Sequence, residues 1–292
     1  MRDARDSQRR RGTMRAGRMD RILSIPAQYL SATVAILLAA IVLIGYPLFE
    51  VRDVVTFAVV AGILVLAHGW ADLVRAPAKY MSAVTILLTG LLAVVAVRLT
   101  DDYAWATVAL GLVVLIAAIM EMTRPLPRAN LVQSLSSSAF GGFVAVTGVA
   151  WITLCRSELW AAIMMTAASL VIVTVIGNQL GRTVRANALW AFVFAVAASV
   201  AASLIAISMG RPAGVLSITF GRLVGSTSAE VSLVAVSVLM GLGVAAVVVI
   251  VDVLFGEHER RISEAGALAR GAAKFLLAVM PIYVIARVGA LL

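Results

Sequence analysis

The sequence predicts an all-α polytopic membrane protein with about nine transmembrane helices, its N-terminus in the cytoplasm and its C-terminus outside. Of its 292 residues, 62% are hydrophobic and 13% are charged, whereas soluble domains carry about 25% charged residues. The mean hydropathy is +1.03. The apolar runs are continuous rather than alternating and reach about twenty residues, the length that crosses a bilayer as a helix. Because alternation is absent, a closed β-barrel is excluded.

Residues 1–25 form a basic cytoplasmic tail that contains eight arginines within its first 21 positions. We expect it to be disordered or to lie on anionic headgroups. Residues 26–292 are expected to form a single transmembrane helical domain. The first apolar run is too long for a signal peptide, and no small-residue cleavage site precedes Glu50. The predicted spans lie near Tyr29–Phe49, Val54–Trp70, Tyr80–Val97, Tyr103–Met120, Leu131–Cys155, Leu159–Leu180, Ala188–Met209, Val231–Phe255 and Ala267–Leu291.

The arginines predict the orientation. Alternate loops carry pairs of basic residues, which favour the cytoplasm. These pairs are Arg75 and Lys79, Arg124 and Arg128, Arg182 and Arg185, and Arg260 and Arg261. The remaining loops carry single basic residues, mostly beside acids, and one of them is the long connection Gly210–Glu230. The net charge of +9 therefore indicates membrane topology, and we expect no nucleic-acid partner.

Several kinds of chemistry are excluded by residue type. One cysteine, Cys155, excludes an internal disulfide and a cysteine metal cluster. Two histidines, His68 and His258, are too few for a three-His zinc site. Known hydrolase, metalloprotease and phosphate-loop motifs are absent. We therefore expect no catalytic residues, no bound metal and no cofactor.

Polar side chains gather at the predicted cytoplasmic ends of the spans. His68 and Asp72 lie four residues apart on one helix face, and Asn178 with Gln179 closes the sixth span. The stretch Val251–Phe275 joins the last two spans and carries ionisable groups at the membrane boundary, where such groups are costly. One interpretation is a cleft for a phosphate or carboxylate; the simpler one is a charged loop, hydrogen bonds between helices and the positive-inside bias. The cleft interpretation assigns anion binding to Arg182, Arg185, Arg260, Arg261, Arg270 and Lys274. It assigns polar contacts to His68, Asp72, Asn178, Gln179 and Asp252.

Three segments resemble the phosphatidate cytidylyltransferase (CDP-diacylglycerol synthase) family. GNQLGR, Gly177–Arg182, resembles the family's G-x-x-x-G-[KR] segment. VDVLFGEHERR resembles the opening of its signature through Asp252 and the Arg260–Arg261 pair, and LLAVMPIYVIARV resembles its last helix, with Pro281 in place. The resemblance covers the C-terminal half and implies a cytidylyltransferase-like arrangement of helices.

The same comparison predicts that nucleotide transfer is lost. Leu170 stands where the family has a metal-binding aspartate, and Lys274 lies near the position of another. Magnesium ions that bridge a triphosphate need several carboxylates. The resemblance therefore implies a catalytically inactive protein on an inherited scaffold.

The sequence leaves three functions open. The first is a multi-pass protein of the bacterial plasma (inner) membrane whose basic cytoplasmic cleft holds an anionic lipid headgroup or a partner protein, with a membrane-protein partner or a homodimer allowed. The alternative is a small-solute permease coupled through His68 and Asp72. A third is a diverged lipid-modifying enzyme with unfamiliar metal ligands.

Overall fold

The computed structural model describes residues 27–45, 51–125, 130–155, 158–208, 229–256 and 263–291. Within these ranges the regular elements are helices. They are α2 (Ala27–Gly45), α3 (Val51–Val74), α4 (Lys79–Thr100), α5 (Ala104–Met122), α6 (Leu131–Gly148), α7 (Ala150–Thr153), α8 (Glu158–Gly177), α9 (Val184–Ser208), α11 (Ala229–Gly256) and α12 (Glu264–Leu291). The expected basic tail (1–25), most of the long connection Gly210–Glu230, and His258, Arg260 and Arg261 lie outside the described residues.

The long helices have the length and composition of membrane spans. Eight helices in the described part are long and apolar enough to cross a bilayer. The expected fifth span consists of α6 and α7 together, which give the apolar stretch Leu131–Thr153. The expected sixth span is α8, whose described apolar stretch is Ile163–Gly177. The prediction of an all-α polytopic membrane protein is confirmed.

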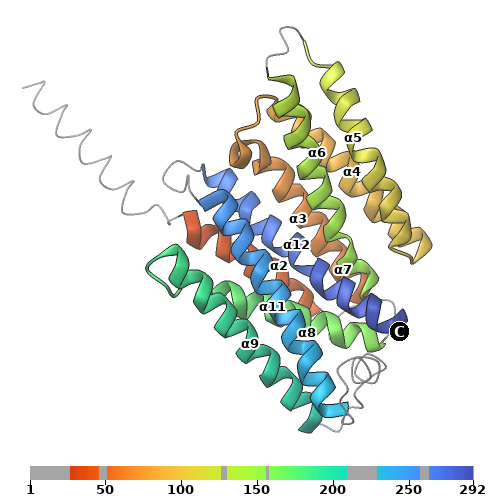
Figure 1. Cartoon of the computed structure of the whole chain (residues 1–292). Coiled ribbons are helices and arrows are strands. Elements are labelled where there is room, and N and C mark those ends of the chain that lie inside the picture. Colours follow the sequence, from red (N-terminus) through yellow and green to blue (C-terminus); the bar gives the residue numbers. More distant parts are fainter. Residues whose placement is uncertain are drawn as a thin grey trace, which may run out of the picture.

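Helix α12 lies inside the bundle and contacts α2, α3, α6, α8 and α11. In Figure 1, α4, α5 and α6 lie on one side of it and α8, α9 and α11 lie on the other. Successive long helices run in opposite directions, so the starts of α2, α9 and α12 meet the ends of α3, α8 and α11. We call the end of the bundle at which these helix termini meet the amino end of the bundle.

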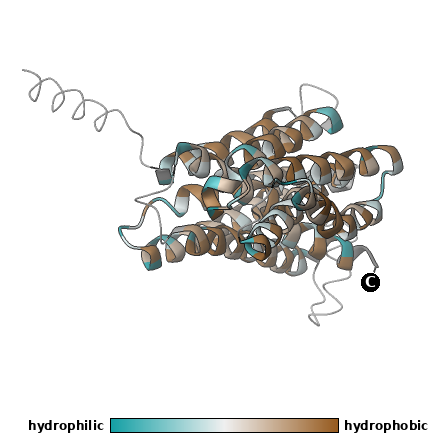
Figure 2. Cartoon of the chain, turned by 90° about the horizontal axis from the view of Figure 1, so that it is seen from above, coloured by the Kyte–Doolittle hydropathy of each residue, from teal (hydrophilic) through white to brown (hydrophobic). Residues whose placement is uncertain are grey.

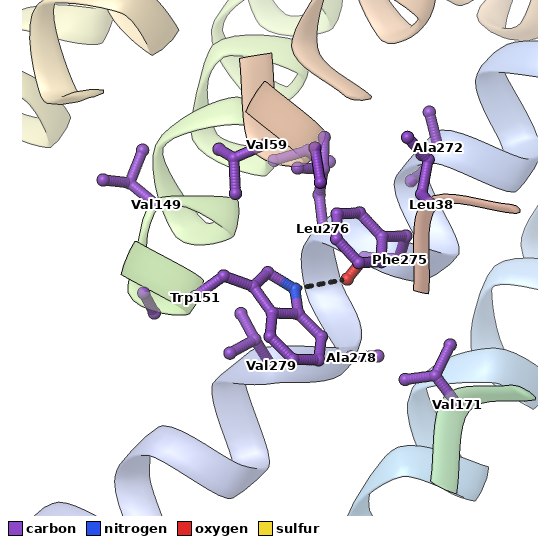
Figure 3. Packing of buried hydrophobic residues seen from close by; sticks show 14 of the residues in the cluster. Leu38, Val59, Val149, Trp151, Val171, Ala272, Phe275, Leu276, Ala278 and Val279 are labelled. Carbon is purple, nitrogen blue, oxygen red and sulfur yellow. Dashed lines mark hydrogen bonds between the residues drawn. The ribbon is translucent and has the colours of Figure 1, made fainter. Parts of the chain in front are cut away.

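Aromatic packing holds α12 against α7. Trp151 and Phe275 stack with ring centroids 5.1 Å apart and planes 7° from parallel. The Trp151 Nε1–H donates a hydrogen bond to the backbone oxygen of Phe275 over 3.0 Å (Figure 3). Both side chains are fully buried, and a buried indole N–H needs such a partner.

Small residues bring α11 close to α12. A Cβ on Gly243 would lie 2.5 Å from the Cβ of Pro281, the proline inside α12. Glycine at this position therefore permits close approach of the two helices, as small residues do in membrane bundles. Hydrophobic residues cover the long faces of the helices, while hydrophilic ones gather toward their ends (Figure 2).

Candidate functional site

A buried cluster of charged side chains joins α11 and α12 at the amino end of the bundle. Asp252 lies in the last turn of α11, four residues before Gly256. Arg270 and Lys274 lie one helical turn apart on α12 and therefore share one face. Side chains on a helix lean toward its start, so both cations reach back to the carboxylate at the amino end.

The Asp252 carboxylate accepts hydrogen bonds from three side chains. Arg270 Nε lies 2.8 Å from Oδ1, and Arg270 Nη2 lies 3.3 Å from the backbone oxygen of Asp252. Lys274 Nζ lies 2.8 Å from Oδ2 and 2.7 Å from Oδ1. The Asn178 amide, directly after α8, donates to Oδ2.

This cluster of ionisable side chains is shielded from solvent. Arg270 is 4% exposed, Lys274 is 1% exposed and Asn178 is 3% exposed. Arg270 and Lys274 also interact with groups other than Asp252. A charge in this environment is stable only when it is paired and hydrogen-bonded.

A small pocket of about 50 Å³ lies beside the cluster. Its lining residues come from the starts of α2 and α9, the segment after α8, the end of α11 and α12. They are Gln28, Asn178, Gln179, Val184, Asn187, Ala188, Val249, Asp252, Val253 and Arg270. Val184 is 64% exposed and Val253 is 49% exposed, so these two valines form an apolar rim on the outside of the bundle.

Among the residues that the structure describes, two that line the pocket have a buried amide oxygen without a hydrogen-bond partner. They are Gln179 Oε1 and Asn187 Oδ1. Buried polar atoms are nearly always hydrogen-bonded in folded proteins. These two oxygens are therefore unusual among the buried polar atoms of the described residues.

The first turn of α9 adds a favourable field for anions. Val184 is the first residue of α9, and the Thr183 hydroxyl accepts a hydrogen bond from the Ala186 N–H over 3.2 Å. The start of a helix carries about half a positive charge. Arg182 precedes this turn in the chain and Arg185 lies within it, and both are exposed.

The structure brings five of the sequence-predicted site residues to one place and leaves others apart. Asn178, Gln179, Asp252 and Arg270 line the pocket, and Lys274 binds Asp252 behind it. Arg182 and Arg185 do not line the pocket but flank its rim in the chain. Arg260 and Arg261 lie outside the described residues.

His68 and Asp72 belong to a different surface. His68 is exposed on α3. Asp72 forms an ion pair with Lys79 over 2.5 Å and accepts a hydrogen bond from Ser263 over 3.2 Å. These contacts tie the end of α3 to the start of α4 and to the residue before α12.

Two polar pocket residues, Gln28 and Asn187, were not among the sequence predictions. Both are amides in the first turn or two of an apolar helix. The sequence did offer one signal for these two residues, which is a polar amide placed just inside an apolar span. Nothing in the sequence, however, places the starts of α2 and α9 beside each other.

The serines and Glu121 near the amino end have local partners. Ser134 donates to Glu121 over 2.8 Å, and Arg124 Nη1 lies 2.8 Å from the same carboxylate. Ser82 and Ser138 are hydrogen-bonded at 2.7 Å. These contacts join α4, α5 and α6, so they stabilise helix packing.

No protein-family model, curated protein or solved structure matches this chain. The resemblance to the cytidylyltransferases therefore stays a prediction. At the two positions that depart from that family, Leu170 is buried in the apolar core at 1% exposure, and Lys274 is bonded to Asp252. Among the described residues, no group of three His, Cys, Asp or Glu side chains is placed to hold a metal ion.

Proposed function

We propose that this protein binds the phosphate group of an anionic lipid at the amino end of the bundle, as a non-catalytic protein of the bacterial plasma membrane. The observation that carries the proposal is the buried Asp252 cluster, which places two cationic side chains, Arg270 and Lys274, at a pocket near the helix ends. A positive charge in a poorly solvated wall attracts an anion more strongly than the same charge in water.

The position of the pocket supports a lipid as the ligand. Its apolar rim, Val184 and Val253, is exposed at the start of α9 and near the end of α11, and lipid chains would pack against it. The phosphate would lie at the rim, near the start of α9 and near Arg182 and Arg185. Basic residues near a membrane surface contribute about 1 kcal/mol each to the binding of anionic lipids.

The same residues make nucleotide transfer a poor fit. A pocket of about 50 Å³ holds a group of a few atoms. Of its lining residues, Asp252 carries the one carboxylate, and that carboxylate already binds Arg270, Lys274 and Asn178. Metal ions that bridge a triphosphate need several free carboxylates. The proposal therefore keeps the cytidylyltransferase-like scaffold and assigns it no reaction.

Competition between lipids tests this function. The purified protein in nanodiscs is titrated with a fluorescent anionic lipid against phosphatidylcholine as the zwitterionic reference. We expect wild type to prefer the anionic lipid, and the double variant R182Q/R185Q to lose about thirtyfold of that preference. Arg287→Gln is the matched control, because Arg287 is an exposed arginine near the far end of α12. Equal binding of anionic and zwitterionic lipid by wild type overturns the proposal.

The permease alternative has one observation in its favour. Asp252, Arg270 and Lys274 are ionisable groups within membrane-spanning helices, and such groups mark ion and substrate routes in transporters. A transporter would show solute uptake in proteoliposomes that is abolished by Asp252→Asn or Asp72→Asn. Uptake unchanged by both substitutions excludes these residues as coupling groups.

A further inference from the structure

A second cavity, of about 110 Å³, lies at the opposite end of the bundle from the Asp252 cluster. We call it the outer pocket, because α3 begins and α4 ends there and the arginine pattern predicts that this end faces outside. Its lining residues are Arg52, Val97, Asp101, Ile152, Thr153 and Cys155. One water molecule takes about 10–15 Å³ of such a volume, so the outer pocket has room for a molecule of about five to eight non-hydrogen atoms.

The last turn of α4 holds the guanidinium of Arg52 in this wall. Its Nη2 donates to the backbone oxygen of Arg98 over 3.0 Å and to that of Val97 over 3.4 Å. The last carbonyl oxygens of a helix lack partners within the helix, and a cation beside them is favourable. Both hydrogen bonds that Arg52 donates to the described residues run through Nη2. Its Nε–H and Nη1–H groups are therefore available to a ligand.

Asp101 brings a carboxylate to the same wall. It directly follows α4 with a φ of 58°, and its N–H donates to the backbone oxygen of Val97 over 2.9 Å. Its carboxylate forms an ion pair with Arg52. The side chains of Arg52 and Asp101 are 34% and 53% exposed, so both charges of this pair are partly open to solvent.

A wall with two adjacent charges of opposite sign selects the charge pattern of its ligand. A simple anion would be attracted by Arg52 and repelled by Asp101, and a simple cation would meet the reverse. A molecule that carries both charges can lie alongside the pair in the opposite direction. Each of its charges then faces an opposite one, and the Arg52–Asp101 contact stays in place. Because these two side chains are in direct contact, the two charges of the ligand must also be only a few atoms apart.

We propose that the outer pocket binds a small zwitterion with adjacent charges, an α-amino acid with a short side chain. The carboxylate of the ligand accepts hydrogen bonds from Arg52, and its ammonium group donates to the carboxylate of Asp101. Such a molecule fits a cavity of about 110 Å³. In a zwitterionic lipid headgroup the ammonium and the phosphate are further apart, which suits this wall less well. The site is separate from the lipid pocket at the amino end and does not depend on the proposed function.

Three probes of similar size separate the two charges of the ligand. L-alanine carries both charges, propionate carries only the carboxylate, and ethylamine carries only the ammonium group. Saturation-transfer NMR measures the affinity of each probe for the purified protein in phosphatidylcholine nanodiscs. We expect alanine to bind at least about tenfold more tightly than propionate or ethylamine, because each of these lacks one charge-assisted hydrogen bond.

Substitutions of the two charged residues assign the contacts. Arg52→Gln should weaken the binding of alanine to that of ethylamine, and Asp101→Asn should weaken it to that of propionate. Asparagine tolerates a positive φ, so Asp101→Asn keeps the turn. Arg98 and Asp53 give the matched controls: they form an ion pair over 2.7 Å between the same two helices and do not line the pocket. Arg98→Gln and Asp53→Asn should bind alanine as wild type does, and thermal unfolding checks that every variant is folded.

Four results overturn the inference. The first is no saturable binding of alanine by wild type up to about 10 mM, and the second is equal affinity for alanine and propionate, which indicates a simple anion site. The third is a loss in the control variants equal to that in Arg52→Gln and Asp101→Asn, which assigns the effect to packing of α3 against α4. The fourth is displacement of alanine by phosphoethanolamine at comparable concentration, which assigns the pocket to a lipid headgroup. If the two pocket variants do not fold, the probe series on wild type decides alone.

Discussion

Replacing Asp252 by asparagine tests whether the buried charge cluster acts as one energetic unit. The substitution keeps the size of the side chain and removes its charge. Arg270 and Lys274, which are only 4% and 1% exposed, then lack the carboxylate that both contact. We expect this change to be among the most destabilising single substitutions in the described bundle.

The magnitude follows from the contact distances. At about 2.8 Å and an effective dielectric constant of about 20, one ion pair contributes about 6 kcal/mol of Coulomb attraction. The cost of removing the ions from water is of similar size, so the net value of an intact pair is small. Removing one partner alone, however, costs about 3–5 kcal/mol because an uncompensated charge stays buried. We therefore expect Asp252→Asn to lower the free energy of unfolding by about 3–5 kcal/mol.

Unfolding free energies measured in lipid bicelles provide the assay. Lys274→Met removes one cation, so the double variant with Asp252→Asn should be less destabilised than Asp252→Asn alone by at least about 1 kcal/mol. Asp53→Asn is the matched control: it also removes a carboxylate from an ion pair, with Arg98 at 2.7 Å, but its side chain is 63% exposed. Exposed pairs contribute at most about 1 kcal/mol. If Asp252→Asn costs no more than Asp53→Asn, the cluster does not hold the bundle as described.

Two other substitutions test the packing of α12. Gly69→Ala would place a Cβ 1.8 Å from a backbone oxygen of α12, and overpacking of this kind costs about 1–3 kcal/mol. The control Gly111→Ala has nothing within 4 Å of the added Cβ and should leave the unfolding free energy unchanged. Equal unfolding free energies for the two variants would contradict the close α3–α12 contact. Trp151→Phe keeps an aromatic ring against Phe275 but removes the indole N–H that donates over 3.0 Å. It should lower the unfolding free energy by about 1–3 kcal/mol, and an unchanged value in the same assay would show that this hydrogen bond does not contribute.

The polar residues at the helix ends show which part of the site could be predicted from the sequence. Asp252, Arg270 and Lys274 stood out in the sequence because charges within apolar runs are costly and need partners, and the structure joins them. His68 and Asp72 drew attention for the same reason, yet Asp72 pairs with Lys79 on another surface. The sequence marked which groups require partners. It could not choose among several partners at the same depth.

The class of the protein was decided by the sequence alone. In a bilayer every backbone polar group must be satisfied within its own segment, so a long apolar run becomes a helix whatever surrounds it. The composition of the site was decided only by the tertiary structure. Helices that are apolar on nearly all faces carry little periodic signal for their rotation or their neighbours, and those are set by close packing of small residues. Packing alone therefore placed Asn178 beside Asp252, and the starts of α2 and α9 around one pocket.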